Sequence, residues 1–179
     1  MIFYIFSDFS DILILLIVII VKRGENDLSR DEFEAFYNKY KEYVYKLCYT
    51  YMKRAADAED CAEDVFVKVL SNDLKFNGEE HEKRWLAVAA ANHCKNKLKK
   101  RNRDGAPLSD ITDEVQEENK NDEVLQAVLS LPDKYKSVVW LYYYDGYKTA
   151  EIAKILKKPA STVRNLLSEA RAILKKVLE

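Results

Sequence analysis

The chain has 179 residues, of which 48% are hydrophobic, four are glycine and three are proline. This length allows one large domain or two small ones, and the scarcity of glycine and proline favours an all-α fold. The formal net charge of −1 excludes a basic field over the whole molecule, so affinity for nucleic acid must come from local clusters of Lys and Arg.

The N-terminal extension, residues 1–28, contains an unbroken run of Ile, Leu and Val at residues 12–21. This run is shorter than the roughly 20 residues that a membrane-spanning helix needs, and a longer span would bury Asp8 and Asp11. Three hypotheses stay open: a membrane anchor, an apolar segment that packs on the body, or an extension from a start codon placed too far upstream. We favour the last over membrane contact by residues 1–21, because Ser29 and Glu32 form a capping box that begins the folded part afresh.

Two helices are predicted next, at residues 31–52 and 57–70. Apolar residues recur at helical spacing in the first helix and predict a buried aromatic stripe. The stripe consists of Phe33, Phe36, Tyr37, Tyr40, Val44, Leu47 and Tyr51. The second helix carries five carboxylates on one face, which are Asp57, Glu59, Asp60, Glu63 and Asp64. This face either docks on a basic helix of a partner or is a solvated face favoured by the helix dipole.

A polar loop at residues 71–82 is predicted to lead into a third helix, which starts at Lys83 and ends in a basic half. The basic half contains Lys95, Lys97, Lys99, Lys100, Arg101 and Arg103 without an acid among them. It can neutralise several phosphates of a nucleic acid. Phe76 and Trp85 can stack on an unpaired base or pack in the core, and for Trp85 we expect core packing.

Residues 104–121 are rich in Asp and Glu and are typical of an acidic linker between two helical domains. In the second domain, residues 122–179, we predict a helix at 134–144, whose tyrosines 142–144 form packing surface, and a helix-turn-helix at 149–171. We expect Thr149 to cap the first helix of this motif, and Ser161 or Thr162 to cap the second after Pro159. The alternative is an ordinary helical hairpin with a solvated polar face.

The order of these segments resembles the extracytoplasmic-function (ECF) sigma factors of the sigma-70 family, the promoter-specificity subunits of bacterial RNA polymerase. Residues 57–60 and 65–68 resemble region 2.2, Trp85-Leu86 and Ala91-Asn92 resemble regions 2.3 and 2.4, and residues 131–171 resemble region 4. The resemblance covers residues 29–178. It implies a sigma2-like domain at 29–103 and a sigma4-like domain at 122–179, joined by the linker at 104–121.

The resemblance also implies a role for each surface. The acidic face would grip the β′ coiled coil of core RNA polymerase, and the β flap is a further implied contact. The residues implied in melting and reading the −10 element are Lys75, Phe76, Lys83, Arg84, Asn92, Lys95, Asn96, Lys99 and Arg101. Those implied in reading the −35 element are Thr149, Lys158, Ser161, Thr162, Arg164, Asn165, Ser168 and Arg171. Promoter DNA as ligand, an anti-sigma factor clamped across both domains and a cytoplasmic location are implied as well.

The sequence departs from the family pattern in four places. Lys157 stands where many relatives have Gly after the first helix of the motif, so a different turn geometry is expected there. Glu169 lies where a basic residue is common, and Asn96 replaces a frequent Asp. The apolar N-terminus has no counterpart in the family.

Other classes of protein find little support in the sequence. A P-loop and a nucleophile elbow are missing, so we do not predict an enzyme. Cys48, Cys61 and Cys94 stand far apart, and His93 and Cys94 occupy adjacent helical positions that point in different directions, so we predict no metal site and no cofactor. The rival hypotheses are a free-standing helix-turn-helix regulator and, less favoured, a membrane-tethered interaction protein.

Overall fold

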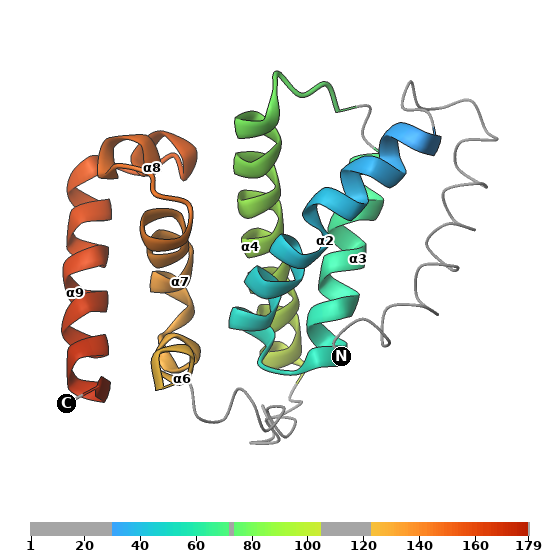
Figure 1. Ribbon diagram of the computed structural model, residues 1–179. Helices are drawn as coiled ribbons and strands as arrows, with labels where there is room; N and C mark the ends of the chain where they lie inside the picture. The colour runs from blue at the N-terminus through green and yellow to red at the C-terminus, as the bar shows by residue number, and fades with distance from the viewer. Residues whose placement is uncertain (1–29, 72–73, 105–122, 179) are drawn as a thin grey trace.

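The computed structural model describes residues 30–71, 74–104 and 123–178, most of which form helices (Figure 1). The N-terminal half comprises α2 (Arg30–Met52), α3 (Ala55–Ser71) and α4 (Glu79–Arg103). The C-terminal half comprises α6 (Glu123–Ser130), α7 (Asp133–Val139), the π-helical turn η1 (Trp140–Tyr144), α8 (Thr149–Ile155) and α9 (Ala160–Leu178). No strand occurs within these ranges, which confirms the all-α prediction.

Several sequence predictions concern residues outside the described ranges. They include the apolar run at 12–21, the capping residue Ser29 and the acidic linker beyond Asp104. The domain boundaries placed at that linker therefore remain predictions. Among the described helices, none is both long enough and apolar enough to cross a membrane.

The helices α2, α3 and α4 form a bundle around the aromatic stripe of α2. Phe33, Tyr40 and Leu47 of this stripe are buried, which confirms the predicted core face. Phe33 meets Phe66 of α3 edge to face, with ring centroids 6.5 Å apart. Such an arrangement places the positive edge of one ring against the negative face of the other, and adds to the free energy gained from burial.

The third helix begins four residues earlier than predicted, at Glu79 and not at Lys83. Gly78 precedes it with φ 84°, a left-handed conformation that glycine adopts at little cost. Three glutamates then occupy the first turn, where the positive end of the helix dipole favours carboxylates. The prediction of a polar loop at residues 71–82 missed this helix start, because acidic residues are common in loops as well as in the first turns of helices.

The predicted helix at 134–144 divides into α7 and η1. The Asp145 amide donates to the Trp140 carbonyl at 3.1 Å, a contact five residues back along the chain that widens the last turn. Residues 145–148 connect this wide turn to α8 and α9, whose facing sides bury Ile152, Val163 and Leu167. The predicted helix-turn-helix spacing is confirmed.

The predicted caps of the two helices in this motif are wrong. Lys148 is the N-cap of α8, and its backbone amide donates to Glu151 Oε2 at 2.8 Å, so Thr149 is already the first helical residue. The helix α9 begins at Ala160, and the Val163 amide closes its first turn on the Pro159 carbonyl at 3.2 Å. Ser161 and Thr162 therefore lie inside the helix, because the fixed φ of proline already directs the chain into the first turn.

The turn after α8 keeps a left-handed conformation despite the absence of glycine. Lys157 has φ 51°, and Lys53, between α2 and α3, has φ 61°. The expectation of a different geometry at Lys157 is thus wrong, because tertiary packing of α8 on α9 holds the backbone in the conformation that glycine would favour. A non-glycine residue pays roughly 1–2 kcal/mol for this conformation.

We predict that Lys157→Gly stabilises the protein. Relief of the left-handed conformation outweighs the extra freedom of glycine in the unfolded chain, so the free energy of unfolding should rise by about 0.5–1 kcal/mol. Chemical denaturation followed by circular dichroism measures this change. The matched control is Lys158→Gly, one residue later and outside the positive-φ positions, which should give no gain; equal gains in both variants would contradict the argument.

Candidate nucleic-acid and protein interfaces

The outward face of α9 is the first candidate site. Arg164, Asn165 and Ser168 are exposed, while the neighbouring Val163 and Leu167 are buried. This alternation leaves one arginine, one amide and one hydroxyl free to reach the edges of bases from a helix of 19 residues.

The turn that enters α9 supplies groups suited to phosphate. Lys158 and Ser161 are exposed there, and Thr162 and Thr149 are half-buried. The first turn of α9 contains no acidic residue, so its backbone amides and the positive end of the helix dipole are not neutralised by a neighbouring carboxylate. The predicted residues therefore gather at one end of the motif.

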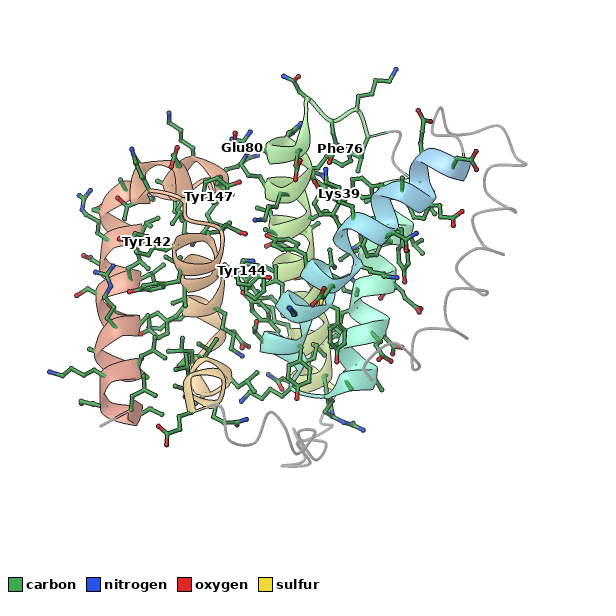
Figure 2. All side chains as sticks on the ribbon, in the orientation of Figure 1. Lys39, Phe76, Glu80, Tyr142, Tyr144 and Tyr147 are labelled. Carbon is green, nitrogen blue, oxygen red and sulfur yellow. The ribbon has the colours of Figure 1, made fainter. Side chains whose placement is uncertain are left out.

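Arg171, the last of the predicted −35 residues, is engaged within the molecule. Its Nε donates to the Tyr143 hydroxyl at 2.8 Å, and its guanidinium lies over the Tyr142 ring, 5.2 Å from the centroid. Tyr142 is labelled in Figure 2 beside α9. Arg171 thus fastens η1 to α9, a role that the sequence did not indicate. Tyr143 and Tyr144 themselves are 57% and 51% exposed, so the predicted packing surface is only partly covered.

Glu169, which departs from the family pattern, also has a structural role. It accepts a hydrogen bond from the Tyr135 hydroxyl at 2.7 Å and lies 3.5 Å from Lys134 Nζ. The hydrogen bond from Tyr135 and the charge of Lys134 lower the pKa of this carboxyl. The acid therefore ties α9 to α7, on the side of the helix away from Arg164.

The outward face of α4 is the second candidate site. Asn92, Asn96, Lys99 and Arg103 recur at intervals of three or four residues, and all four are exposed. Lys75, in the loop before α4, is exposed as well. This stripe combines amides with positive charges, which are the groups that bind bases and phosphates of an opened strand.

Four other cations of α4 are paired within the protein. Arg101 donates to Asp57 at 3.1 Å, and Lys97 lies 3.6 Å from Asp60. The other two reach the C-terminal half: Lys83 lies 3.0 Å from Asp145, and Lys95 donates to Ser137 at 2.8 Å. Arg84, a further predicted −10 residue, is half-buried and lies 3.8 Å from Glu80. The predicted −10 residues thus separate into an exposed stripe and a paired set.

The predicted stacking residue Phe76 belongs to an aromatic cluster beside the start of α4 (Figure 2). It stacks on Phe36 with centroids 5.6 Å and planes 7° apart, and it meets Trp85 edge to face at 5.8 Å. Trp85 is partly buried against the core, in agreement with the packing that we expected for it. The ring of Phe76 would have to leave Phe36 before a base could stack on that face.

The acidic face of α3 is partly neutralised by α4. Asp57, Asp60 and Asp64 lie opposite Arg101, Lys97 and His93, spaced four residues apart on α4. Glu59 and Glu63 have no cation partner among the described residues. Burial raises the pKa of each, and neighbouring carboxylates raise it further. Glu59 and Glu63 are therefore the carboxylates of this face that are available to pair with a basic partner protein.

His93 and the cysteines form no metal site within the described residues. His93 lies between Asp64 and Lys68, 2.8 Å from each, and burial lowers its pKa. Cys48, Cys61 and Cys94 meet in the core despite their separation in sequence, and all three are fully buried. A hydrogen bond with Cys94 and burial raise the pKa of Cys61, and a hydrogen bond with Cys48 and burial raise the pKa of Cys94, which keeps these two thiols protonated and unreactive.

Sequence reasoning missed the residues that join the two halves. Two hydrogen bonds join residues more than 80 positions apart: Tyr43 of α2 bonds to Asp145, and Tyr51 of α2 bonds to Ser137. In the sequence, all four look like ordinary helix and turn residues. No local pattern could have identified them. The clearest signal was the density of aromatic residues on both sides.

Comparisons with known proteins cover most of the chain. Residues 36–104 match the family model "Sigma-70 region 2", and residues 121–174 match "Sigma-70, region 4". The ECF RNA polymerase sigma factor SigW of Bacillus subtilis is 27% identical over 177 residues, covering 88% of this chain and 92% of that protein. RNA polymerase sigma-H factor of Pseudomonas aeruginosa is 26% identical over 179 residues, covering 89% and 90%.

A solved structure resembles the fold. The sigma factor RpoE from Bartonella quintana, in a co-crystal with the anti-sigma factor NepR, superposes with a TM-score of 0.62 and 18% identity. The match covers 82% of this chain and 96% of that one. At this identity the likeness establishes the arrangement of helices only.

The pairing of α3 with α4 predicts opposite effects of two substitutions. Asp57→Asn removes the partner of a half-buried Arg101 and should lower the free energy of unfolding by about 1 kcal/mol. Glu63→Gln removes a charge that the fold disfavours, and should raise it by a few tenths of a kcal/mol at pH 7, on the order expected for a screened surface charge.

The pH dependence checks the second effect. A carboxyl whose folded-state pKa is raised costs stability above that pKa, and this cost disappears as the pH falls and the group is protonated. Urea titrations at pH 7 and near pH 4 should therefore show the gain from Glu63→Gln at pH 7 and a smaller gain at the lower pH. A gain that does not change with pH would contradict the assignment.

Proposed function

The chain belongs to the sigma-70 family, in its ECF group, and from this premise we propose how each surface takes part in promoter-specific transcription initiation. Region 2 spans α2 to α4, and region 4 spans α6 to α9. The chain is an alternative sigma factor, and the presence of both regions in one chain is the observation that carries this conclusion. A free-standing helix-turn-helix regulator has no counterpart to region 2.

The helix α9 is the proposed reader of the −35 element. Arg164, Asn165 and Ser168 enter the major groove, where an arginine and an amide can each pair with a base edge through two hydrogen bonds. Lys158, Ser161 and the amides at the start of α9 bind phosphate and fix the register of the helix. Exposure of these side chains on one helix face supports the proposal.

The helix α4 is the proposed site for the −10 element. Its exposed stripe binds the opened non-template strand, with Asn92 and Asn96 available to base edges and Lys99 to phosphate. Phe76, just before α4, and Trp85, within α4, supply aromatic surface for a base that leaves the stack once Phe76 has separated from Phe36. Lys83, Lys95 and Arg101 join the site only when their present partners release them.

The acidic face of α3 is the proposed docking site for core polymerase. Glu59 and Glu63 offer charge without an internal partner among the described residues, and Asp60 and Asp64 remain 63% and 54% exposed beside them. A basic coiled coil, such as the β′ element that the family resemblance implies, relieves the repulsion among these carboxylates when it binds. The β flap is the proposed contact of the C-terminal half.

An anti-sigma factor is a further proposed partner. The neighbouring solved structure pairs the sigma factor RpoE with the anti-sigma factor NepR. The exposed DNA faces on α4 and α9 give such a partner two surfaces to cover at once. The location of the protein in the cytoplasm follows from these partners and belongs to the same proposal.

The direct test mixes the purified chain with bacterial core RNA polymerase and genomic fragments. We expect co-elution with the core enzyme and new transcripts from specific start sites. The double variant Glu59→Lys/Glu63→Lys should lose most of its affinity for core polymerase, because it repels a basic partner. The control Glu42→Lys reverses the charge of an exposed residue on α2 and should retain that affinity. Binding to duplex DNA without binding to core polymerase would favour the free-standing regulator.

Arg164→Ala tests the reading of the −35 element. It should cost about 1–3 kcal/mol of discrimination at one base pair of the element, because a paired base edge loses its donor. Binding to a set of promoters with single substitutions measures the effect. Lys176→Ala, a basic residue in the last turn of the same helix, should lower affinity slightly and evenly; an unchanged base preference in Arg164→Ala would argue against the groove assignment.

A further inference from the structure

The aromatic turn η1 holds Arg171 of α9 in one orientation. Nε of Arg171 donates to the Tyr143 hydroxyl at 2.8 Å, and the guanidinium lies over the rings of Tyr142 and Tyr143, 5.2 Å and 5.8 Å from their centroids. The two rings meet edge to face, with centroids 4.9 Å apart. A planar guanidinium held over aromatic rings has lost much of its rotamer freedom before any ligand arrives.

These contacts leave the charge of Arg171 without a counterion. Among the described residues its partners are two tyrosines and no carboxylate, and the side chain is exposed on α9. The Nε–H is used by Tyr143, whereas the N–H groups of both terminal nitrogens are available to a ligand. Arg171 therefore presents an oriented positive charge to the surface.

Tyr143 offers a second donor at the same place. A tyrosine hydroxyl both donates and accepts, and this hydroxyl accepts from Arg171, so its own proton points elsewhere. No described residue accepts that proton, and Tyr143 is 57% exposed. The neighbouring positive charge polarises the O–H bond and strengthens it as a donor. An anion beside this pair meets N–H and O–H donors from two different elements.

The place of the pair on the helix-turn-helix indicates which anion it meets. Arg164, Ser168 and Arg171 recur at intervals of four and three residues, so they share one face of α9, and all three are exposed. Because an α-helix rises about 1.5 Å per residue, Arg171 lies about 10 Å beyond Arg164 along the helix axis. The major groove is about 12 Å wide. With Arg164 at the bases, Arg171 reaches the edge of the groove, where the phosphates lie.

A contact at this edge complements the phosphate contacts already proposed for Lys158 and Ser161. Those residues precede Arg164 in the motif, whereas Arg171 follows it by two turns. Phosphate contacts on both sides of the base-reading residues fix the tilt of the helix as well as its register. The π-helical geometry of η1 supports a functional role for its tyrosines, because such turns are rare and occur frequently at functional sites.

We propose that Arg171 and Tyr143 form a second phosphate-binding site for duplex DNA, at the far edge of the −35 groove. Tyr142 is a positioning residue that acts through Arg171. The proposal rests on the proposed function and deepens it, because it assigns a further contact with the same promoter element. Since the site binds a phosphate and no base, its contribution is the same for every base sequence.

Duplexes with single neutral phosphates test this site. A methylphosphonate removes the charge of one phosphate, and it is placed at each position in turn across a duplex that is selected from genomic fragments by binding to the full chain, alone or with core RNA polymerase. We expect one position, beyond the bases read by Arg164, at which the unmodified chain binds about tenfold more weakly, the size of one hydrogen bond to a charged group.

Variants assign that position to the pair. Arg171→Gln should bind the unmodified duplex about tenfold more weakly and lose its sensitivity to the methylphosphonate, and Tyr143→Phe should reduce that sensitivity to about threefold. Arg171→Gln should also lower the slope of log affinity against log salt concentration by about one. Tyr143→Phe removes no charge and should leave this slope unchanged, and Arg171→Lys should restore it.

The matched control is Tyr135→Phe, which removes a tyrosine hydroxyl that donates to Glu169 on the other side of α9. It should keep both the affinity and the sensitive phosphate. Circular dichroism verifies that the variants fold; if Arg171→Gln does not, Tyr143→Phe and Arg171→Lys carry the comparison.

The outcomes separate this site from the proposed function. If no methylphosphonate distinguishes the unmodified chain from the variants of Arg171 and Tyr143, Arg171 is only a structural brace and the inference is overturned, while transcription by core polymerase still supports the proposed function. A sensitive phosphate without such transcription would overturn the proposed function and keep the phosphate site. A chain that binds no duplex, alone or with core polymerase, would overturn both.

Discussion

Burial of one face of α4 is the interaction on which the rest of the structure depends. Leu86, Ala90, Cys94 and Leu98 are buried against α2 and α3. Because small residues such as Ala90 admit a close approach, the long helix is held along most of its length. This packing fixes the opposite face as an exposed stripe, and it leaves the flanking positions to pair with α3 on one side and with the C-terminal half on the other.

This arrangement determines which charged side chains neutralise one another inside the molecule. A net charge of −1 conceals 29 basic and 30 acidic groups, many of which neutralise one another inside the molecule. Arg101 and Lys97 satisfy acids of α3, and Lys83 satisfies Asp145. On the candidate interfaces, the described residues left without an internal cation or anion partner include most of the stripe on α4, the polar face of α9, and Glu59 and Glu63. Pairing decides which surface can attract DNA and which can attract a basic protein.

Much of the fold was predictable from the chain, because helical periodicity is a local property. The helices at residues 30–52, 55–71 and 160–178, and the outward position of Arg164, Asn165 and Ser168, follow from the spacing of apolar residues. Predictions failed where tertiary contacts override local preference. The start of α4, the N-cap at Lys148, the start of α9 at Ala160 and the left-handed Lys157 all depend on neighbouring elements that hold the backbone in place.

The sequence by itself determined an all-α chain with two recognisable regions, because the order and spacing of apolar and charged residues specify helices and their outward faces. Only the tertiary structure decided which charged residues are available. Lys83, Lys95 and Arg101 belong to the same basic helix as exposed Lys99, yet each has a partner dozens of positions away. Contacts over such separations arise from packing geometry, which no local pattern encodes, so the contacts of Asp145 with Lys83 and Tyr43 could be found only in the tertiary structure.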